Sequence, residues 1–225
     1  MISIISTVAY ALASIPTVLL TARATNARMR KTPAEELSPA PVPYSLSAKT
    51  VLLWIALAAI SALCGFVISQ KATYPLALPV LGICYLAALS AAVMDLKIRI
   101  IPNYIPLSVI GIRSVIFIYE FIVTDTALEY LLSSLIGCLL CFVLLGVANK
   151  ISKGGIGGGD IKLLSAIGFC SGVYLVFSAL ILALICCSLV SVVLLITKKK
   201  EMKGSLPFGP FIYVGITLGC LLTLY

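Results

Sequence analysis

Two aspartates, Asp95 and Asp160, are the side chains of this sequence best suited to chemistry. Each stands where a long apolar run meets a short polar connection, and a charge at a membrane boundary is costly unless it is paired or hydrated. The sequence has no histidine, which excludes Ser-His and Cys-His nucleophiles, HExxH metal sites and histidine-bound zinc. Catalysis would therefore have to use carboxylates, lysines, hydroxyls or thiols.

Each aspartate taken alone has a structural alternative. Asp160 suits the N-cap or first turn of a helix, and Asp95 suits charge balance with Lys97 and Arg99. Both aspartates fall at the same membrane depth on the same side, so a helical bundle can bring their carboxyls together. Two carboxyls a few ångströms apart cannot both ionise near neutral pH. One can then act as base on a shared water while the other, protonated, hydrogen-bonds a scissile carbonyl.

The segment before Asp160 is dense in glycine, and Gly157, Gly158 and Gly159 directly precede the carboxyl group. A backbone without side chains can approach an extended peptide closely and offer it unpaired N–H and C=O groups. The alternative is a flexible linker.

The bulk composition indicates a membrane protein. Of 225 residues, 61% are hydrophobic and only 11% charged, against about a quarter charged in soluble domains. Apolar runs recur along the whole chain, and about 20 apolar residues cross a hydrocarbon core. The net charge of +8 comes from basic residues between these runs, which indicates the positive-inside rule and not a nucleic-acid partner. The eight cysteines lie in or beside apolar runs, which favours packing between helices over disulfides or zinc.

The expected fold is all-α, a polytopic transmembrane helical bundle of about eight spans in one membrane domain, residues 1–225. Residues 1–22 are a retained first span with its N-terminus outside, 23–49 a proline-rich cytoplasmic loop, and 50–225 the helical core. The apolar runs expected to cross the membrane are 1–21, 50–69, 74–94, 104–123, 130–149, 161–171, 173–196 and 206–225.

If each of these runs crosses the membrane once and the loop 23–49 is cytoplasmic, the basic residues fall on the cytoplasmic side, except Lys71 outside and Arg113 within a run. Glu120, Asp125 and Glu129 fall on the outer side. The run 161–171 is too short for an ordinary span and is expected in the bundle interior or in a thin region. Arg113 needs a carboxylate from another span or water, unless its span begins later than drawn.

Gly157-x-Gly159-Asp160 is the GxGD motif of membrane aspartyl proteases. The chain resembles the type IV prepilin peptidase family over most of residues 75–225, and it lacks the PAL tripeptide of the presenilin-like branch. Three segments in order carry the resemblance: Asp95 with Ile101-Pro102-Asn103, then Gly157-Gly158-Gly159-Asp160-Ile161-Lys162, then Leu206-Pro207-Phe208-Gly209-Pro210-Phe211.

The resemblance implies an enzyme that removes positively charged leaders from type IV prepilins, pseudopilins or flagellin-like subunits. Cleavage would follow a glycine at the cytoplasmic edge of a prokaryotic cytoplasmic membrane, with Asp95 and Asp160 as the catalytic pair. No cofactor or metal is expected for proteolysis. The residues expected to bind substrate or shape the site are Lys97, Pro102, Asn103, Gly157, Gly158, Gly159, Lys162, Pro207, Phe208, Gly209 and Pro210.

Long members of the family carry a zinc-binding cytoplasmic domain with two CxxC pairs and methylate the new N-terminus. Residues 23–49 contain no cysteine, so structural zinc is not expected, and S-adenosylmethionine would be needed only if methyl transfer is retained. Lys97 and Lys162 have a topology-setting alternative. A rival function is an ion-coupled transporter or channel with Asp95 and Asp160 as cation or proton sites. The absence of an inverted repeat and the edge position of both acids disfavour it.

Overall fold

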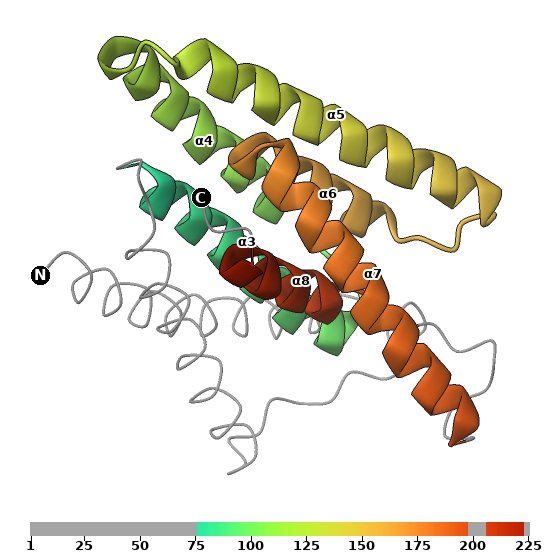
Figure 1. The fold of residues 1–225 in the computed structure, drawn as a ribbon. Coiled ribbons are helices and arrows are strands. Elements are labelled where there is room, and N and C mark those ends of the chain that lie inside the picture. Colours follow the sequence, from blue (N-terminus) through green and yellow to red (C-terminus); the bar gives the residue numbers. More distant parts are fainter. Residues whose placement is uncertain (1–75, 198–205, 223–225) are drawn as a thin grey trace, which may run out of the picture.

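The computed structural model describes residues 76–197 and 206–222, apart from the side chain of Lys97. All regular structure in these residues is helical, as the sequence predicts. The helices are α3 (Ala77–Ile98), α4 (Tyr104–Val123), α5 (Ala127–Ile151), α6 (Gly158–Ser171), α7 (Val173–Ile196) and α8 (Gly209–Leu222) (Figure 1). The expected span at the N-terminus, the loop 23–49 and the run 50–69 lie outside the described residues.

Four of these helices, α3, α4, α5 and α7, are long and apolar enough to cross a membrane. Helices α6 and α8 have 14 residues each. At 1.5 Å per residue such a helix is about 21 Å long, shorter than a hydrocarbon core of about 30 Å. Each apolar run predicted from 74–94 onward corresponds to one of the described helices. Because α6 and α8 are short, the predicted count of eight membrane crossings is not established.

The short helix α6 lies among the longer ones, in contact with α3, α4, α5 and α7. Its buried residues include Leu164 and Ile167, which pack in one core with Leu89 of α3 and Ile216 of α8. Helix α8 packs against α3 and α7, and the buried hydroxyls of Tyr85 and Tyr213 hydrogen-bond across the α3–α8 contact. The core thus fixes α3, α6 and α8 relative to one another.

Large apolar side chains on α4, α5 and α7 point away from this core. Leu107, Leu139 and Leu189, one on each of these helices, are each well over half exposed. Lipid is the solvent that suits these faces, because an apolar surface of this extent is unfavourable in water. The exposed faces agree with the membrane assignment made from composition.

Glycine allows α5 and α6 to cross closely. A Cβ on Gly137 would lie 2.9 Å from the carbonyl oxygen of Gly168, and a Cβ on Gly168 would lie 2.6 Å from that of Gly137. Neither position accepts a side chain without the helices separating. Small residues at helix crossings are the usual means of close packing in membranes.

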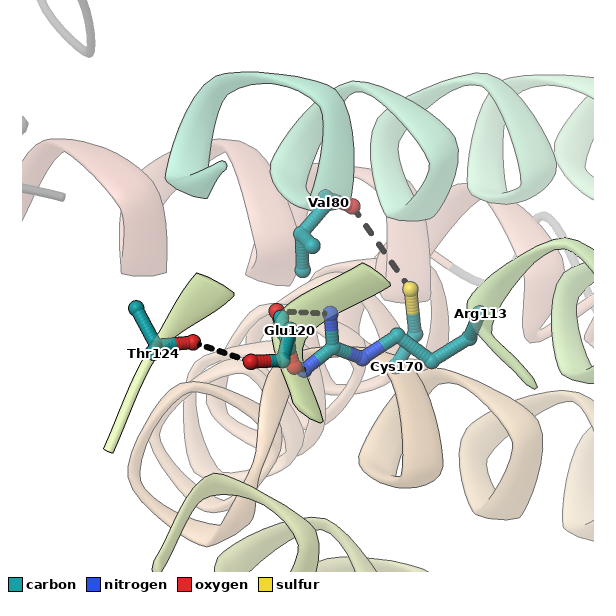
Figure 2. Close-up of polar contacts among 5 residues, drawn as sticks. All are labelled: Val80, Arg113, Glu120, Thr124 and Cys170. Atoms are coloured by element: carbon teal, nitrogen blue, oxygen red, sulfur yellow. Dashed lines mark hydrogen bonds and ion pairs between the residues drawn. The ribbon is translucent and has the colours of Figure 1, made fainter. Parts of the chain in front are cut away.

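Arg113, for which the sequence suggested a carboxylate from another span, forms an ion pair within α4. Its Nη1 lies 2.7 Å from Oε1 of Glu120 and its Nη2 3.1 Å from Oε2, and the two residues are only 3% and 0% exposed (Figure 2). The guanidinium also lies 3.9 Å from the ring centroid of Phe117. Among the alternatives that the sequence left open for Arg113, the structure shows a carboxylate partner, but on the same helix, because two turns bring Glu120 onto the same buried face.

The described cysteines are all free thiols, in agreement with their expected packing role. Cys141 is buried and Cys138 half-buried, so the CxxC sequence in α5 forms no disulfide. Cys170 of α6 is buried, with its thiol 3.6 Å from the carbonyl oxygen of Val80 (Figure 2).

Candidate active site

Asp95 lies in the last turn of α3 and is 7% exposed. The helix ends three residues later because Arg99 adopts a left-handed conformation, with φ 51°, and its N–H donates to the carbonyl oxygen of Asp95. This C-terminal cap ends α3 before the loop that contains Pro102. The carboxyl of Asp95 is thereby held at the end of the bundle where α4 begins.

The third sequence segment contacts Asp95 directly. Gly209 is the first residue of α8, and its N–H donates to Oδ2 of Asp95 over 2.6 Å. A Cβ on Gly209 would lie 2.8 Å from the Asp95 Cβ and 3.0 Å from Oδ2, so only glycine allows this approach. Pro207, Phe208 and Pro210 flank this contact and are half-buried, and Phe208 packs against the core.

Asp160 lies in the first turn of α6, with its N–H directed at the carbonyl oxygen of Gly157. Its Oδ1 is buried and has no hydrogen-bond partner among the described residues. Burial, and after it the negative charge of Asp95, raises the pKa of Asp160 to about 7. The charge of Asp95 contributes to this raised pKa, and Ile101 in the loop after Asp95 lies against Gly159. The fold therefore brings the two aspartates to the same end of the bundle, although 65 positions separate them in the sequence.

The three glycines before Asp160 have different surroundings. A Cβ on Gly157 would lie 2.7 Å from Oδ2 of Asp160, and one on Gly159 would lie 2.9 Å from the Cβ of Ile101. A Cβ on Gly158 would meet nothing within 4 Å. Contacts within the protein therefore explain why Gly157 and Gly159 carry no side chain. At Gly158 there is open space, which leaves room for the close approach of a peptide that the sequence predicts.

The loop after Asp95 packs onto the beginning of α6. Ile101 and Pro102 are buried, and Ile101 lies against Gly159. Asn103 precedes the first residue of α4, and its side-chain Oδ1 accepts a hydrogen bond from Nζ of Lys162 over 3.1 Å. Lys162 is thus oriented toward the loop, and the side chain of Lys97 lies outside the described part of the structure.

Sequence reasoning missed Asn149, which shapes the loop in front of the glycines. Its side-chain Oδ1 accepts from the N–H of Ile156, and its carbonyl oxygen accepts from the N–H of Gly154 at the end of α5. Lys153 and Gly154 take positive φ values of 52° and 90° there. The sequence could have indicated this role, because Asn149 precedes a glycine pair at the end of an apolar run, and asparagine side chains often hydrogen-bond the backbone of a following turn.

The three sequence segments therefore converge at one end of the bundle. The carboxyl of Asp95 on α3 accepts a backbone N–H, and the charge of Asp95 acts on the carboxyl of Asp160 on α6, whose Oδ1 is buried without a hydrogen-bond partner among the described residues. Such a pair can divide the roles of base and acid in hydrolysis. Within the described ranges, no group of three or more His, Cys, Asp or Glu residues is arranged to hold a metal ion.

Comparison with known proteins identifies a family that the chain resembles. The model of the type IV leader peptidase family matches residues 81–192, a range that includes both aspartates. A prepilin leader peptidase/N-methyltransferase of Bacillus subtilis (strain 168) is 32% identical over 133 residues, which are 58% of this chain and 50% of that protein. The chain thus aligns with about half the length of this curated relative. No solved structure matches the chain.

Proposed function

Because this chain belongs to the type IV leader peptidase family, we propose that it is an aspartic endopeptidase that removes leaders from type IV prepilin-like proteins. The observation that carries the proposal is that Asp95 and Asp160 lie at the same end of the bundle, where burial and the charge of Asp95 raise the pKa of Asp160. A carboxyl that titrates near neutrality beside a second carboxyl is suited to acid–base catalysis.

The proposed reaction uses one water molecule held between the two carboxyls. The ionised carboxyl takes a proton from the water as its oxygen attacks the scissile carbonyl carbon. The protonated carboxyl donates to the carbonyl oxygen, where negative charge develops. When the tetrahedral intermediate collapses, the C–N bond breaks and the departing amine receives the proton taken from water.

We infer that the substrate approaches from the membrane, with its apolar helix in lipid and its positively charged leader in the cytoplasm. Cleavage after a glycine would place a backbone without a side chain at the carboxyls, next to the open space at Gly158. Basic residues near the carboxyls, such as Lys162 and Arg99, support a cytoplasmic orientation of this end. The enzyme would then act at the inner edge of a prokaryotic cytoplasmic membrane.

The decisive experiment is cleavage of a co-expressed or detergent-solubilised prepilin by the wild type and by two variants, Asp95→Asn and Asp160→Asn. Asparagine keeps the shape of each side chain but cannot ionise. We expect loss of the leader with the wild type and retention with both variants. Cleavage at the wild-type rate by either variant would exclude the aspartyl mechanism, and no cleavage of several prepilins by the wild type would favour ion transport.

Peptide cleavage by this pair needs no cofactor, whereas methylation of the new N-terminus would consume S-adenosylmethionine. The same assay separates the two reactions. Cleavage is run with and without S-adenosylmethionine, and the mass of the mature N-terminal peptide is measured. A mass increase by one methyl group only in its presence would assign the second reaction to this chain.

A further inference from the structure

We propose that the N-terminus of α8 holds Asp95 as the carboxylate of the pair and that Asp160 is the partner that carries the proton. This division of roles rests on the proposed function and goes beyond it, because hydrolysis by two aspartates is possible with either assignment. The proposal makes Gly209 a positioning residue that acts on the reaction through Asp95.

Burial disfavours the charge of Asp95, and a backbone hydrogen bond and a nearby positive charge oppose that effect. Its Oδ2 accepts the N–H of Gly209 over 2.6 Å, at the first residue of α8, where the unpaired N–H groups and the helix dipole are positive. Hydrogen bonds from backbone N–H groups to a carboxylate stabilise the ionised form. The positive charge of Arg99, one turn later in the chain, acts in the same direction.

The surroundings of Asp160 favour its neutral form. Its Oδ1 is buried, and none of the described residues donates a hydrogen bond to it. Asp160 lies in the first turn of α6, but the causes that act on its pKa are burial and the charge of Asp95, with no hydrogen bond from the described ranges that favours the ionised form. The nearest basic group on the same helix, Lys162, donates to Asn103. The charge that acts on Asp160 is the negative one of Asp95.

The assignment gives each carboxyl one task. Asp95 takes the proton from water, and Asp160 donates its proton to the carbonyl oxygen of the substrate. When the C–N bond breaks, Asp95 gives its proton to the amine, and Asp160 regains its own from the hydroxyl of the intermediate. Both groups then return to their starting states, and the balance is one water consumed for one peptide bond broken.

The test compares Gly209→Ala with Gly209→Pro in the prepilin cleavage assay. Both variants add a Cβ against Asp95, but only proline lacks the N–H, and proline is tolerated at the first position of a helix. We expect the acid limb of the kcat/KM–pH profile to move up by about one pH unit or more in Gly209→Pro relative to Gly209→Ala. Equal acid limbs in the two variants would overturn the role of the α8 N-terminus.

A second measurement does not require activity, and so it separates this proposal from the proposed function. Infrared difference spectra at about pH 6, below the raised pKa of Asp160, report the C=O band of a buried protonated carboxyl. We expect Asp160→Asn to lose a band that the wild type and Asp95→Asn retain. Loss of that band in Asp95→Asn and its retention in Asp160→Asn would reverse the roles. If the bands follow our expectation while no prepilin is cleaved, the proton assignment stands and the proposed function fails.

Discussion

Asp160 is held in a place that disfavours its charge, and this has a consequence for stability. Burial and the charge of Asp95 raise its pKa from 3.8 to about 7. Between these two values the folded chain holds a proton on Asp160 that the unfolded chain has released. Stability must therefore fall as pH rises through this window and level off above it.

We expect Asp160→Asn to be more stable than the wild type at about pH 8, since asparagine carries no charge to bury. One pKa unit corresponds to about 1.4 kcal/mol, so the full shift would give up to about 4 kcal/mol, and partial exposure of the residue reduces this to roughly 2 kcal/mol. The gain should shrink as pH is lowered toward about 4, where both states are protonated. Thermal unfolding of the wild type and Asp160→Asn in detergent, at about pH 5 and about pH 8, measures this gain in stability. An equal gain at both values would contradict a raised pKa of Asp160 in the folded chain.

Gly157 is a residue whose identity the active-site carboxyl determines. Its φ of −63° and ψ of 132° suit any amino acid, so its backbone conformation does not require glycine. The added methyl of Gly157→Ala would lie 2.7 Å from Oδ2 of Asp160 and must displace that carboxyl. We expect cleavage to fall by at least about tenfold while the fold is kept, because misplacement of a catalytic group by about 1 Å can cost about 100-fold.

The matched control for Gly157→Ala is Gly146→Ala in α5, where a Cβ would meet nothing within 4 Å. Its cleavage rate should equal that of the wild type. Gly158→Ala is informative in a different way, because no atom of the protein obstructs its Cβ. A loss of cleavage in Gly158→Ala would locate the substrate backbone there. Wild-type rates in Gly157→Ala would show that the contact with Asp160 is unimportant.

At the scale of one helix, α4 depends on the Arg113–Glu120 pair. Both side chains are buried, and Nε of Arg113 has no hydrogen-bond partner among the described residues, so neither charge can be left alone at low cost. We expect Glu120→Gln to lose about 3–5 kcal/mol of unfolding free energy, because it leaves the guanidinium buried without its counter-charge.

The double variant Arg113→Met with Glu120→Leu should recover most of the stability lost in Glu120→Gln. Replacing both partners of a buried ion pair with apolar side chains of similar volume is often close to neutral. Unfolding by denaturant in detergent, completed as a double-mutant cycle with both single variants, measures the coupling. A double variant as unstable as Glu120→Gln would show that the pair has a role other than mutual neutralisation.

Helix positions were predictable from sequence, whereas this pair was not. Apolar runs and Pro102 placed the helices from residue 77 onward to within a few residues, because a span must be apolar and a proline interrupts it. Glu120 was placed with the outer acidic residues because it lies near the end of a run. Its partner is seven residues away on the same helix, and two turns place both residues on one face, but an apolar run does not reveal that this face is buried.

For the whole molecule, the sequence predicted the order of the three segments but not their contacts. Both aspartates were expected at one edge because topology and charge placed them there. The N–H of Gly209 on Asp95 and the contact of Gly159 with Ile101 depend on how α3, α6 and α8 pack, which periodicity does not specify. The uniformly apolar helices of a membrane protein carry little information about which faces meet.

The orientation of the molecule can be tested at the two ends of α5. This helix has 25 residues, about 37 Å, so it can cross the membrane once and separate the loop at Asp125 from the loop at Lys153. Acidic Asp125 and Glu129 lie at its beginning, and basic Lys150 and Lys153 at its end. The positive-inside rule then predicts that the Lys153 loop, and with it Asp160, faces the cytoplasm.

We expect a protease site inserted after Asp125 to be cut only in right-side-out vesicles, and one inserted after Lys153 only in inverted vesicles. Immunoblotting of a tagged chain detects the fragments, and detergent-opened vesicles, in which both sites must be cut, show that each is accessible. Cutting of both sites from one face would mean that α5 does not cross. The opposite pattern would put the carboxyls outside the cell, where a leader retained in the cytoplasm cannot reach them.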